Sequence, residues 1–194
     1  MRIPKRLNVQ TRLAIAIAFM VCLTALACSI NVKKDGSGEE KKVDIETPIG
    51  GIHVDKGADV HDTGLAVYPG AHIKPEASSN EDKDANVDLT FLGYGLRVVA
   101  IEYLSDDAPD KVIAYYKDQL KKFGNVLECH TTGHNVQMDQ KDDSRELTCD
   151  SHSGKTSELK VGSRDNQHVV AVDPDGKGSS FALVYVRTNK GTTI

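Results

Sequence analysis

The chain has 194 residues, of which 24 are lysine or arginine and 28 are aspartate or glutamate. Four of the basic residues and none of the acidic ones lie in the first 27 positions, so the rest of the chain has 20 basic and 28 acidic residues and a net charge near −8. This acidic balance argues against nucleic acid as a partner, because nucleic acids are bound by basic surfaces.

The N-terminal segment has the three-part order of a secretory signal peptide. Residues 1–12 are basic, residues 13–23 are apolar, and the small residues of Ala25-Leu26-Ala27-Cys28 follow. A membrane-spanning helix needs about 20 apolar residues, and the apolar run here is at the lower limit of that range. We therefore expect residues 1–27 to be a signal peptide.

The stretch Ala25-Leu26-Ala27-Cys28 resembles the lipobox of bacterial lipoproteins. The resemblance implies cleavage after Ala27 and attachment of diacylglycerol and an amide-linked acyl chain to Cys28, which together give a stable membrane anchor. By the same resemblance, Ser29 favours the outer membrane if the organism is Gram-negative. The alternatives are cleavage by the general signal peptidase and an uncleaved anchor. In each case most of the chain lies outside the cytoplasm, in the cell envelope.

After Cys28 the sequence predicts a flexible tether and then one domain. Residues 28–42 are polar, contain glycine and serine, and have no periodicity, which is typical of a linker. Residues 43–194 are predicted to form a single domain of about 150 residues, a length that can bury a hydrophobic core.

The first part of this domain predicts strands. Residues 43–55 alternate apolar and polar side chains around Pro48 and Gly50-Gly51, which indicates a hairpin with Ile52 and Val54 directed inward. The pattern then predicts a short strand over 64–71, a polar loop over 75–86, and two strands over 87–105, of which the second is apolar on both faces and therefore central.

A helix is predicted between Ser105 and Gly124. Asp106 or Asp107 can cap it, Pro109 suits its first turn, and Gly124 can end it. Its apolar face consists of Val112, Tyr116, Leu120 and Phe123. Further strands are predicted over 125–131, 145–150, 157–161, 168–173 and 181–188. The fold class is α+β: a mainly antiparallel sheet with one principal amphipathic helix packed on one face. The Tyr68-Pro69-Gly70 stretch before this helix resembles stretches in uncharacterised bacterial envelope proteins, a resemblance that implies no activity.

The cysteines predict one disulfide bond. Cys22 leaves with the signal peptide and Cys28 is lipidated, so Cys129 and Cys149 remain. An exported compartment permits them to pair. The alternatives are free thiols and a tetrahedral zinc site formed by Cys129, His134, Cys149 and His152, although their spacing is unusual for zinc.

A second group of possible metal ligands is His53, Asp55 and His61, because imidazole and carboxylate groups bind divalent metals. The alternative is a solvated polar surface. No catalytic motif or cofactor motif is present in the sequence. We therefore expect a non-enzymatic, membrane-anchored envelope lipoprotein that binds an envelope protein partner. The alternative functions are a metal-handling periplasmic protein and an envelope hydrolase without a recognisable motif.

Overall fold

The computed structural model describes residues 29–34, 40–75, 84–131, 145–149 and 154–190. The predicted signal peptide, residues 1–27, and the predicted lipidation of Cys28 lie outside these ranges, as do His134 and His152.

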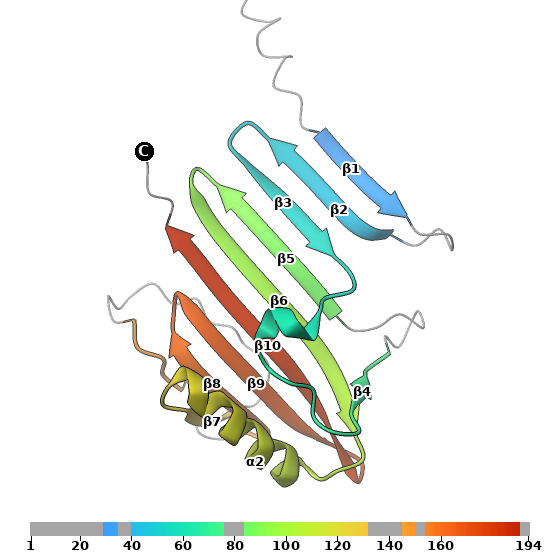
Figure 1. Ribbon diagram of the computed structural model, residues 1–194, viewed down its shortest axis with the longest axis vertical. Coiled ribbons are helices and arrows are strands. Elements are labelled where there is room, and N and C mark those ends of the chain that lie inside the picture. The colour runs from blue at the N-terminus through green and yellow to red at the C-terminus, as the bar shows by residue number, and fades with distance from the viewer. Residues whose placement is uncertain (1–28, 35–39, 76–83, 132–144, 150–153, 191–194) are drawn as a thin grey trace, which may run out of the picture.

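The described residues form one antiparallel sheet with a single α-helix and two 3-10 turns (Figure 1). The helical elements are η1 (Val60–Thr63), α2 (Pro109–Leu120) and η2 (Lys121–Phe123). The strands are β1 (Ser29–Lys34), β2 (Glu40–Thr47), β3 (Gly50–Asp55), β4 (His72–Ile73), β5 (Asp84–Phe91), β6 (Tyr94–Ser105), β7 (Leu127–Thr131), β8 (Thr156–Ser163), β9 (Asn166–Asp175) and β10 (Gly178–Lys190).

The strand order is β1-β2-β3-β5-β6-β10-β9-β8-β7, with β4 paired to β6. Every pair is antiparallel, and the predicted central strand β6 does lie near the middle. The expectation of a mainly antiparallel sheet with one principal helix is confirmed, with the sheet as the dominant part. The predicted hairpin over 43–55 and the strand pair over 87–105 are also present.

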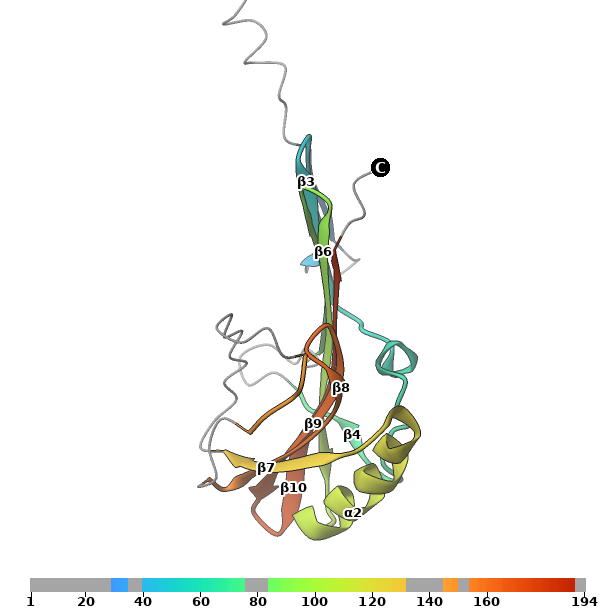
Figure 2. The same ribbon diagram turned by 90° about the vertical axis from the view of Figure 1, so that its left-hand side faces the viewer.

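The helix α2 packs on one face of the sheet, over β8, β9 and β10 (Figure 2). Val112, Tyr116 and Leu120 recur every four residues, face the sheet and are fully buried. Their partners across the layer include Leu159, Val170, Leu183 and Phe181. We call this part the covered half: α2, β7, β8 and β9, with residues 99–105 of β6 and 178–185 of β10.

The start of α2 differs from the prediction. Its N-cap is Ala108, which makes no side-chain cap, and Pro109 occupies the first turn as expected. The Asp107 carboxylate instead accepts hydrogen bonds from the Tyr68 hydroxyl at 2.9 Å and the Lys111 ammonium at 2.6 Å. These bonds lower the pKa of Asp107, with Lys111 as the larger cause.

Residues 64–71 do not form the predicted strand. The Tyr68 N–H donates to the Tyr116 hydroxyl at 3.0 Å, and that hydroxyl donates to the Ala66 carbonyl at 3.2 Å. The Tyr115 hydroxyl donates to the Val67 carbonyl at 3.4 Å. Side chains of α2 therefore hydrogen-bond to backbone groups that would otherwise pair with a neighbouring strand. The segment packs against the helix as a loop.

Two further predictions differ from the structure. The predicted tether over 28–42 contains β1 and the beginning of β2, which pair in register from Ser29 opposite Glu46 to Lys33 opposite Lys42. Ile30 and Val32 of β1 lie opposite Ile45 and Val43 of β2. These apolar pairs join the segment to the sheet, although its polar composition does not predict a strand. Residues 145–149 of the strand predicted over 145–150 have no regular secondary structure.

The rest of the sheet has no helix layer among the described residues, although Arg97 of β6, at the border, pairs with Asp62 of η1 at 3.2 Å. We call this part the open half: β1, β2, β3 and β5, with residues 94–98 of β6 and 186–190 of β10. Seen edge-on, α2 and η1 lie beside the lower part of the sheet, whereas the upper ends of β3 and β6 have no described element on either side (Figure 2).

Candidate functional site

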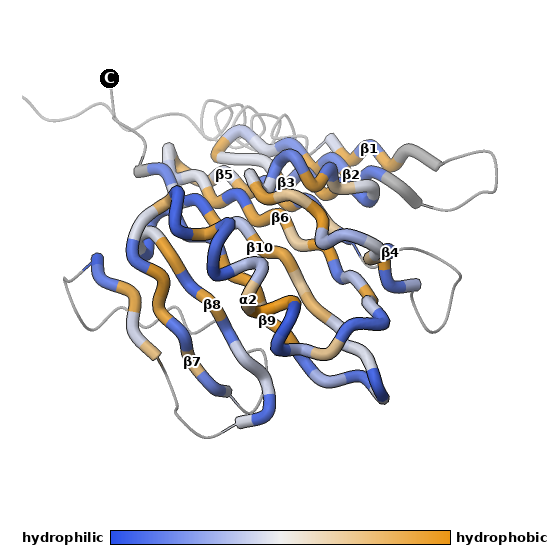
Figure 3. Tube along the Cα trace, turned by 60° about the horizontal axis from the view of Figure 1, so that its bottom comes forward, coloured by the Kyte–Doolittle hydropathy of each residue, from blue (hydrophilic) through white to orange (hydrophobic). Residues whose placement is uncertain are grey.

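Two apolar rows cross the open half from strand to strand. The strand register places Ile30, Ile45, Ile52, Leu89 and Leu96 side by side in one row. It places Val32, Val43, Val54, Val87, Val98 and Val186 in a second row, two residues further along. Since side chains two residues apart point to the same side of a strand, both rows lie on one face, which we call the apolar face. The alternation of hydrophobic and hydrophilic residues along these strands is visible in Figure 3.

The apolar face is on the opposite side of the sheet from α2. Ile101 and Tyr103 of β6 are buried in the core beneath α2. Leu96 and Val98 are separated from them by an odd number of residues, so they point the other way. The strand β6 thus changes its apolar side near Val99, which explains why its sequence is apolar on both faces.

Most of the apolar face is accessible in the described structure, although Val186, at the β10 end of the second row, is only 6% exposed. All the exposed large hydrophobic residues of the described ranges belong to the strands of the open half or to the turns that join them: Ile30, Val32, Ile49, Ile52, Phe91, Leu92 and Tyr94. The expectation that Ile52 and Val54 point into a core is therefore wrong, because Ile52 is 40% exposed, Val54 is partly exposed, and no described element covers them. The two rows contain no charged side chain.

The other side of the open half is polar and contains the predicted metal ligand His53. The Nδ1 of its imidazole is 2.8 Å from Asp44 Oδ1, and its Nε2 is 3.2 Å from Glu46 Oε1. The hydrogen bond to Asp44, with the charge of Glu46, raises the pKa of His53. An imidazole with a carboxylate at each ring nitrogen favours the doubly protonated form, which has no lone pair for a metal.

The other two candidate ligands do not join His53. The Asp55 carboxylate lies 2.5 Å from the Lys42 ammonium. His61 lies on η1, where its backbone N–H donates to Asp59 at 2.9 Å. In the described ranges no group of three or more His, Cys, Asp or Glu side chains is arranged to hold a metal ion. The predicted set His53, Asp55 and His61 is therefore not brought together.

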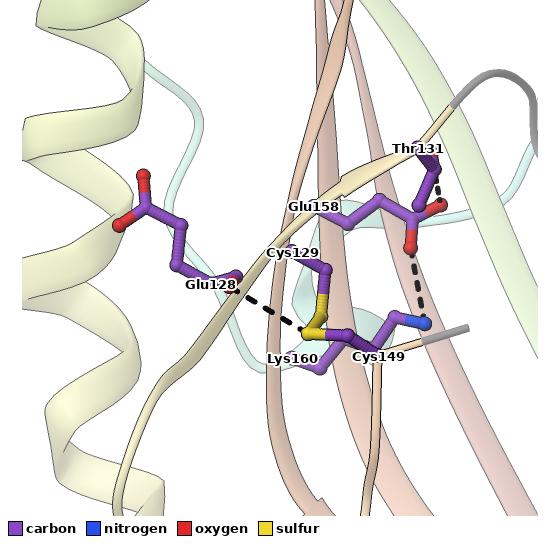
Figure 4. Close-up of a disulfide and its surroundings, with 6 residues drawn as sticks. All are labelled: Glu128, Cys129, Thr131, Cys149, Glu158 and Lys160. Atoms are coloured by element: carbon purple, nitrogen blue, oxygen red, sulfur yellow. Dashed lines mark hydrogen bonds and ion pairs between the residues drawn. A yellow bond between two sulfur atoms is a disulfide. The ribbon is translucent and has the colours of Figure 1, made fainter. Parts of the chain in front are cut away.

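The predicted disulfide between Cys129 and Cys149 is present, with an S–S distance of 2.04 Å (Figure 4). It joins β7 to residues 145–149. Beside it, Glu158 Oε2 and Lys160 Nζ form a largely buried ion pair at 3.0 Å, and the Thr131 hydroxyl donates to Glu158 at 3.4 Å. The Glu158 carboxylate is thus bound by both Lys160 and Thr131. The disulfide and these contacts stabilise the covered half.

A shallow polar depression lies near β4, lined by Lys74, Glu102, Asp173 and Ser180 among other residues. The Lys74 ammonium is 3.3 Å from Glu102 and donates to the Ser180 hydroxyl at 3.0 Å. Asp173 accepts a hydrogen bond from the Thr156 hydroxyl at 2.5 Å. These groups are engaged with one another. Next to the disulfide, on β7 and β8, the Ser157 hydroxyl lies 3.4 Å from His130 Nδ1, and this contact alone does not define a catalytic site.

The apolar face is the feature that the sequence analysis missed. Its signal was present as alternation in residues 43–47, 52–54 and 87–91. That alternation predicts that one side of the strands is apolar. It does not reveal that α2 packs on the opposite side of the sheet and that no described element packs on the apolar side.

No protein-family model, no curated protein and no solved structure matches the chain. The helices in the described ranges are too short or too polar to cross a lipid bilayer.

Proposed function

We propose that this chain is a membrane-anchored envelope lipoprotein that acts as a non-enzymatic binding module, with the apolar face as its binding surface. The observation that supports this most directly is the pair of apolar rows without a described second layer. A lipid anchor on Cys28 and an oxidised Cys129–Cys149 pair both belong to a protein of the cell envelope.

The size of the apolar face suits a protein partner. Neighbouring strands lie about 4.8 Å apart and residues rise about 3.4 Å along a strand, so five strands and two rows with their margins cover roughly 400 Å². The largest apolar patch on a typical monomer covers about 300–600 Å² and is often functional. The partner is expected to present a flat apolar surface, because the two rows offer no charge to pair with.

Anchoring strengthens such binding. Acyl chains on Cys28 would confine the domain to the membrane and raise its effective concentration near partners that are also membrane-bound. Because β1 begins at Ser29, directly after the anchored residue, the open half would stay close to the membrane.

The binding surface is tested by photo-crosslinking in living cells with a photoreactive amino acid at position 87 or at position 88. Val87 and Asp88 are neighbours of similar partial exposure on β5, and they point to opposite sides of the sheet. A discrete crosslinked product from position 87 and none from position 88 is the expected result. Equal products from both positions, or none from position 87, would count against the apolar face as the binding surface.

The anchor is tested separately by mass spectrometry of the mature N-terminus. The expected product begins at Cys28 and contains the mass of the acyl chains, and a Cys28→Ser variant should lose that mass and leave the membrane fraction. An intact N-terminus that retains Met1 without lipid would contradict the lipoprotein assignment.

A further inference from the structure

The turns between β2 and β3 and between β5 and β6 form an exposed apolar end of the sheet. Ile49, Phe91, Leu92 and Tyr94 are each more than half exposed, and we call them the turn cluster. The two turns are neighbours, because the Leu92 N–H donates to the Ile49 carbonyl at 2.8 Å. Residues 47–51 and 90–95 contain no charged side chain, in a chain of which 27% is charged.

Leu92 is a poor choice for the turn that it occupies. Leu92 has a φ of 46° and Gly93 a φ of 82°, and a two-residue hairpin turn with both φ values positive favours Asn-Gly or Gly-Gly. Leucine adopts positive φ only with strain. Because its side chain is 64% exposed, packing within the chain does not compensate for that strain. The residue is therefore better explained by contact with something outside the chain.

The chain enters the sheet at the same end. Ser29, the first residue of β1, lies opposite Glu46, which is one residue from the end of β2. Ser29 is therefore close to the β2–β3 turn. The helix α2 lies toward the opposite end of the sheet (Figure 1).

We propose that the turn cluster inserts into the interfacial region of the lipid bilayer and forms a second membrane contact beside the N-terminal anchor. This inference rests on the membrane attachment in the proposed function. Tyrosine and phenylalanine favour the membrane–water interface, and leucine and isoleucine gain from burial just below it. An apolar, uncharged surface beside Ser29, the residue that follows the proposed anchor, would meet the bilayer before any other partner.

This contact would orient the molecule. With its turns in the membrane, the sheet would stand on the bilayer with its strands directed away from it and with α2 at the distant end. The apolar face would then be presented sideways, where it is open to neighbouring membrane proteins.

The absence of tryptophan from the chain allows a direct test. Leu92→Trp places a single fluorophore in the turn cluster, and Lys177→Trp places one in the exposed β9–β10 turn at the other end of β10. Each full-length protein is purified from membranes and reconstituted into phosphatidylcholine vesicles with or without bromine on the acyl chains. The expected result is a blue-shifted emission from position 92 that loses most of its intensity with brominated lipid, and unchanged emission from position 177.

The outcomes separate this inference from the proposed function. If the protein floats with the vesicles but position 92 is not quenched, the anchor stands and the membrane contact of the turn cluster is overturned. If neither variant floats with vesicles, the membrane attachment itself fails. A blue shift at position 92 that depends on protein concentration, without quenching by brominated lipid, would assign the turn cluster to contact with a second copy and would also overturn the inference.

Discussion

The covered and open halves use the same kinds of apolar residue in opposite ways. Beneath α2, Leu159, Val170 and Leu183 are fully buried by a second layer. In the open half, Ile52 and Leu89 belong to rows of the same composition but remain partly exposed. Strand β6 joins the halves and changes its apolar side between them. The comparison teaches that β-strand alternation defines which side is apolar, whereas the placement of one helix decides whether that side becomes a core or a surface.

The largest expected difference between the halves is the cost of removing a leucine. Leu159→Ala should lower the free energy of unfolding by about 4 kcal/mol, because it leaves a cavity in a closed core. Leu89→Ala should cost about 1 kcal/mol, because its side chain already contacts water. Urea unfolding of both variants with the disulfide intact measures the difference. Equal costs would mean that the open half is as well packed as the covered half.

The disulfide should stabilise only the covered half. Replacing Cys129 and Cys149 together with serine should lower the free energy of unfolding by about 3 kcal/mol, because the bond closes a loop of about 20 residues. Hydrogen exchange should accelerate in β7 and β8 of this variant, while exchange in β2 and β3 relative to the wild type changes little. Faster exchange throughout the sheet would show that the halves unfold as one unit.

Two histidines should give the halves opposite pH dependence. His168 is buried, its ring lies 3.8 Å from that of Phe123, and its Nδ1–H donates to the Thr63 carbonyl at 2.9 Å. Burial, aided by the charge of Lys122, lowers the pKa of His168. Below about pH 6.5 the unfolded chain therefore binds more protons at His168 than the folded chain does. The contribution of His168 to the free energy of unfolding is present above about pH 6.5 and is lost as the pH falls toward the folded pKa.

His53 in the open half has the opposite sign. Its pKa is raised by the hydrogen bond to Asp44 and by Glu46. The contribution of His53 to the free energy of unfolding is therefore present below about pH 6.5 and is lost as the pH rises through the raised folded pKa. Titration of the two imidazole C2 protons by NMR should give a midpoint below the ordinary histidine value for His168 and above it for His53. Identical midpoints would contradict the difference in environment.

The smallest expected effect concerns the β5–β6 turn. Leu92→Asn should raise the free energy of unfolding by up to about 1 kcal/mol, because asparagine tolerates positive φ better than leucine. The same variant should bind vesicles less tightly if the turn cluster contacts lipid. A matched Lys177→Asn change in the β9–β10 turn should leave vesicle binding unchanged. A higher free energy of unfolding with unchanged vesicle binding would mean that Leu92 has no role at the membrane.

Several elements were predictable because their signals are local. The spacing of Val112, Tyr116 and Leu120 and the position of Pro109 are sufficient for α2. The alternation around the β2–β3 and β5–β6 turns is sufficient for both hairpins. The cysteine count, together with the predicted signal peptide, favoured the disulfide over free thiols and a zinc site.

The errors arose where distant residues decide the local structure. Tyr115 and Tyr116 bind the backbone of residues 66–68 from nearly fifty positions away, which no window around Tyr68 reveals. Ile30 and Val32 become β1 only because Ile45 and Val43 lie opposite them. The apolar face was half predictable, because its alternation is local but its lack of a described second layer follows from the position of α2.

The most direct test of the central claim, that the apolar face binds a partner in the cell envelope, is hydroxyl-radical footprinting of the protein in intact envelopes and after purification. Ile52 and Leu89 report on the apolar face, and His53 reports on the opposite side of the same strands. We expect oxidation of Ile52 and Leu89 to fall strongly in the envelope relative to the purified protein, while oxidation of His53 stays the same. Equal oxidation of Ile52 and Leu89 in both preparations would contradict the account.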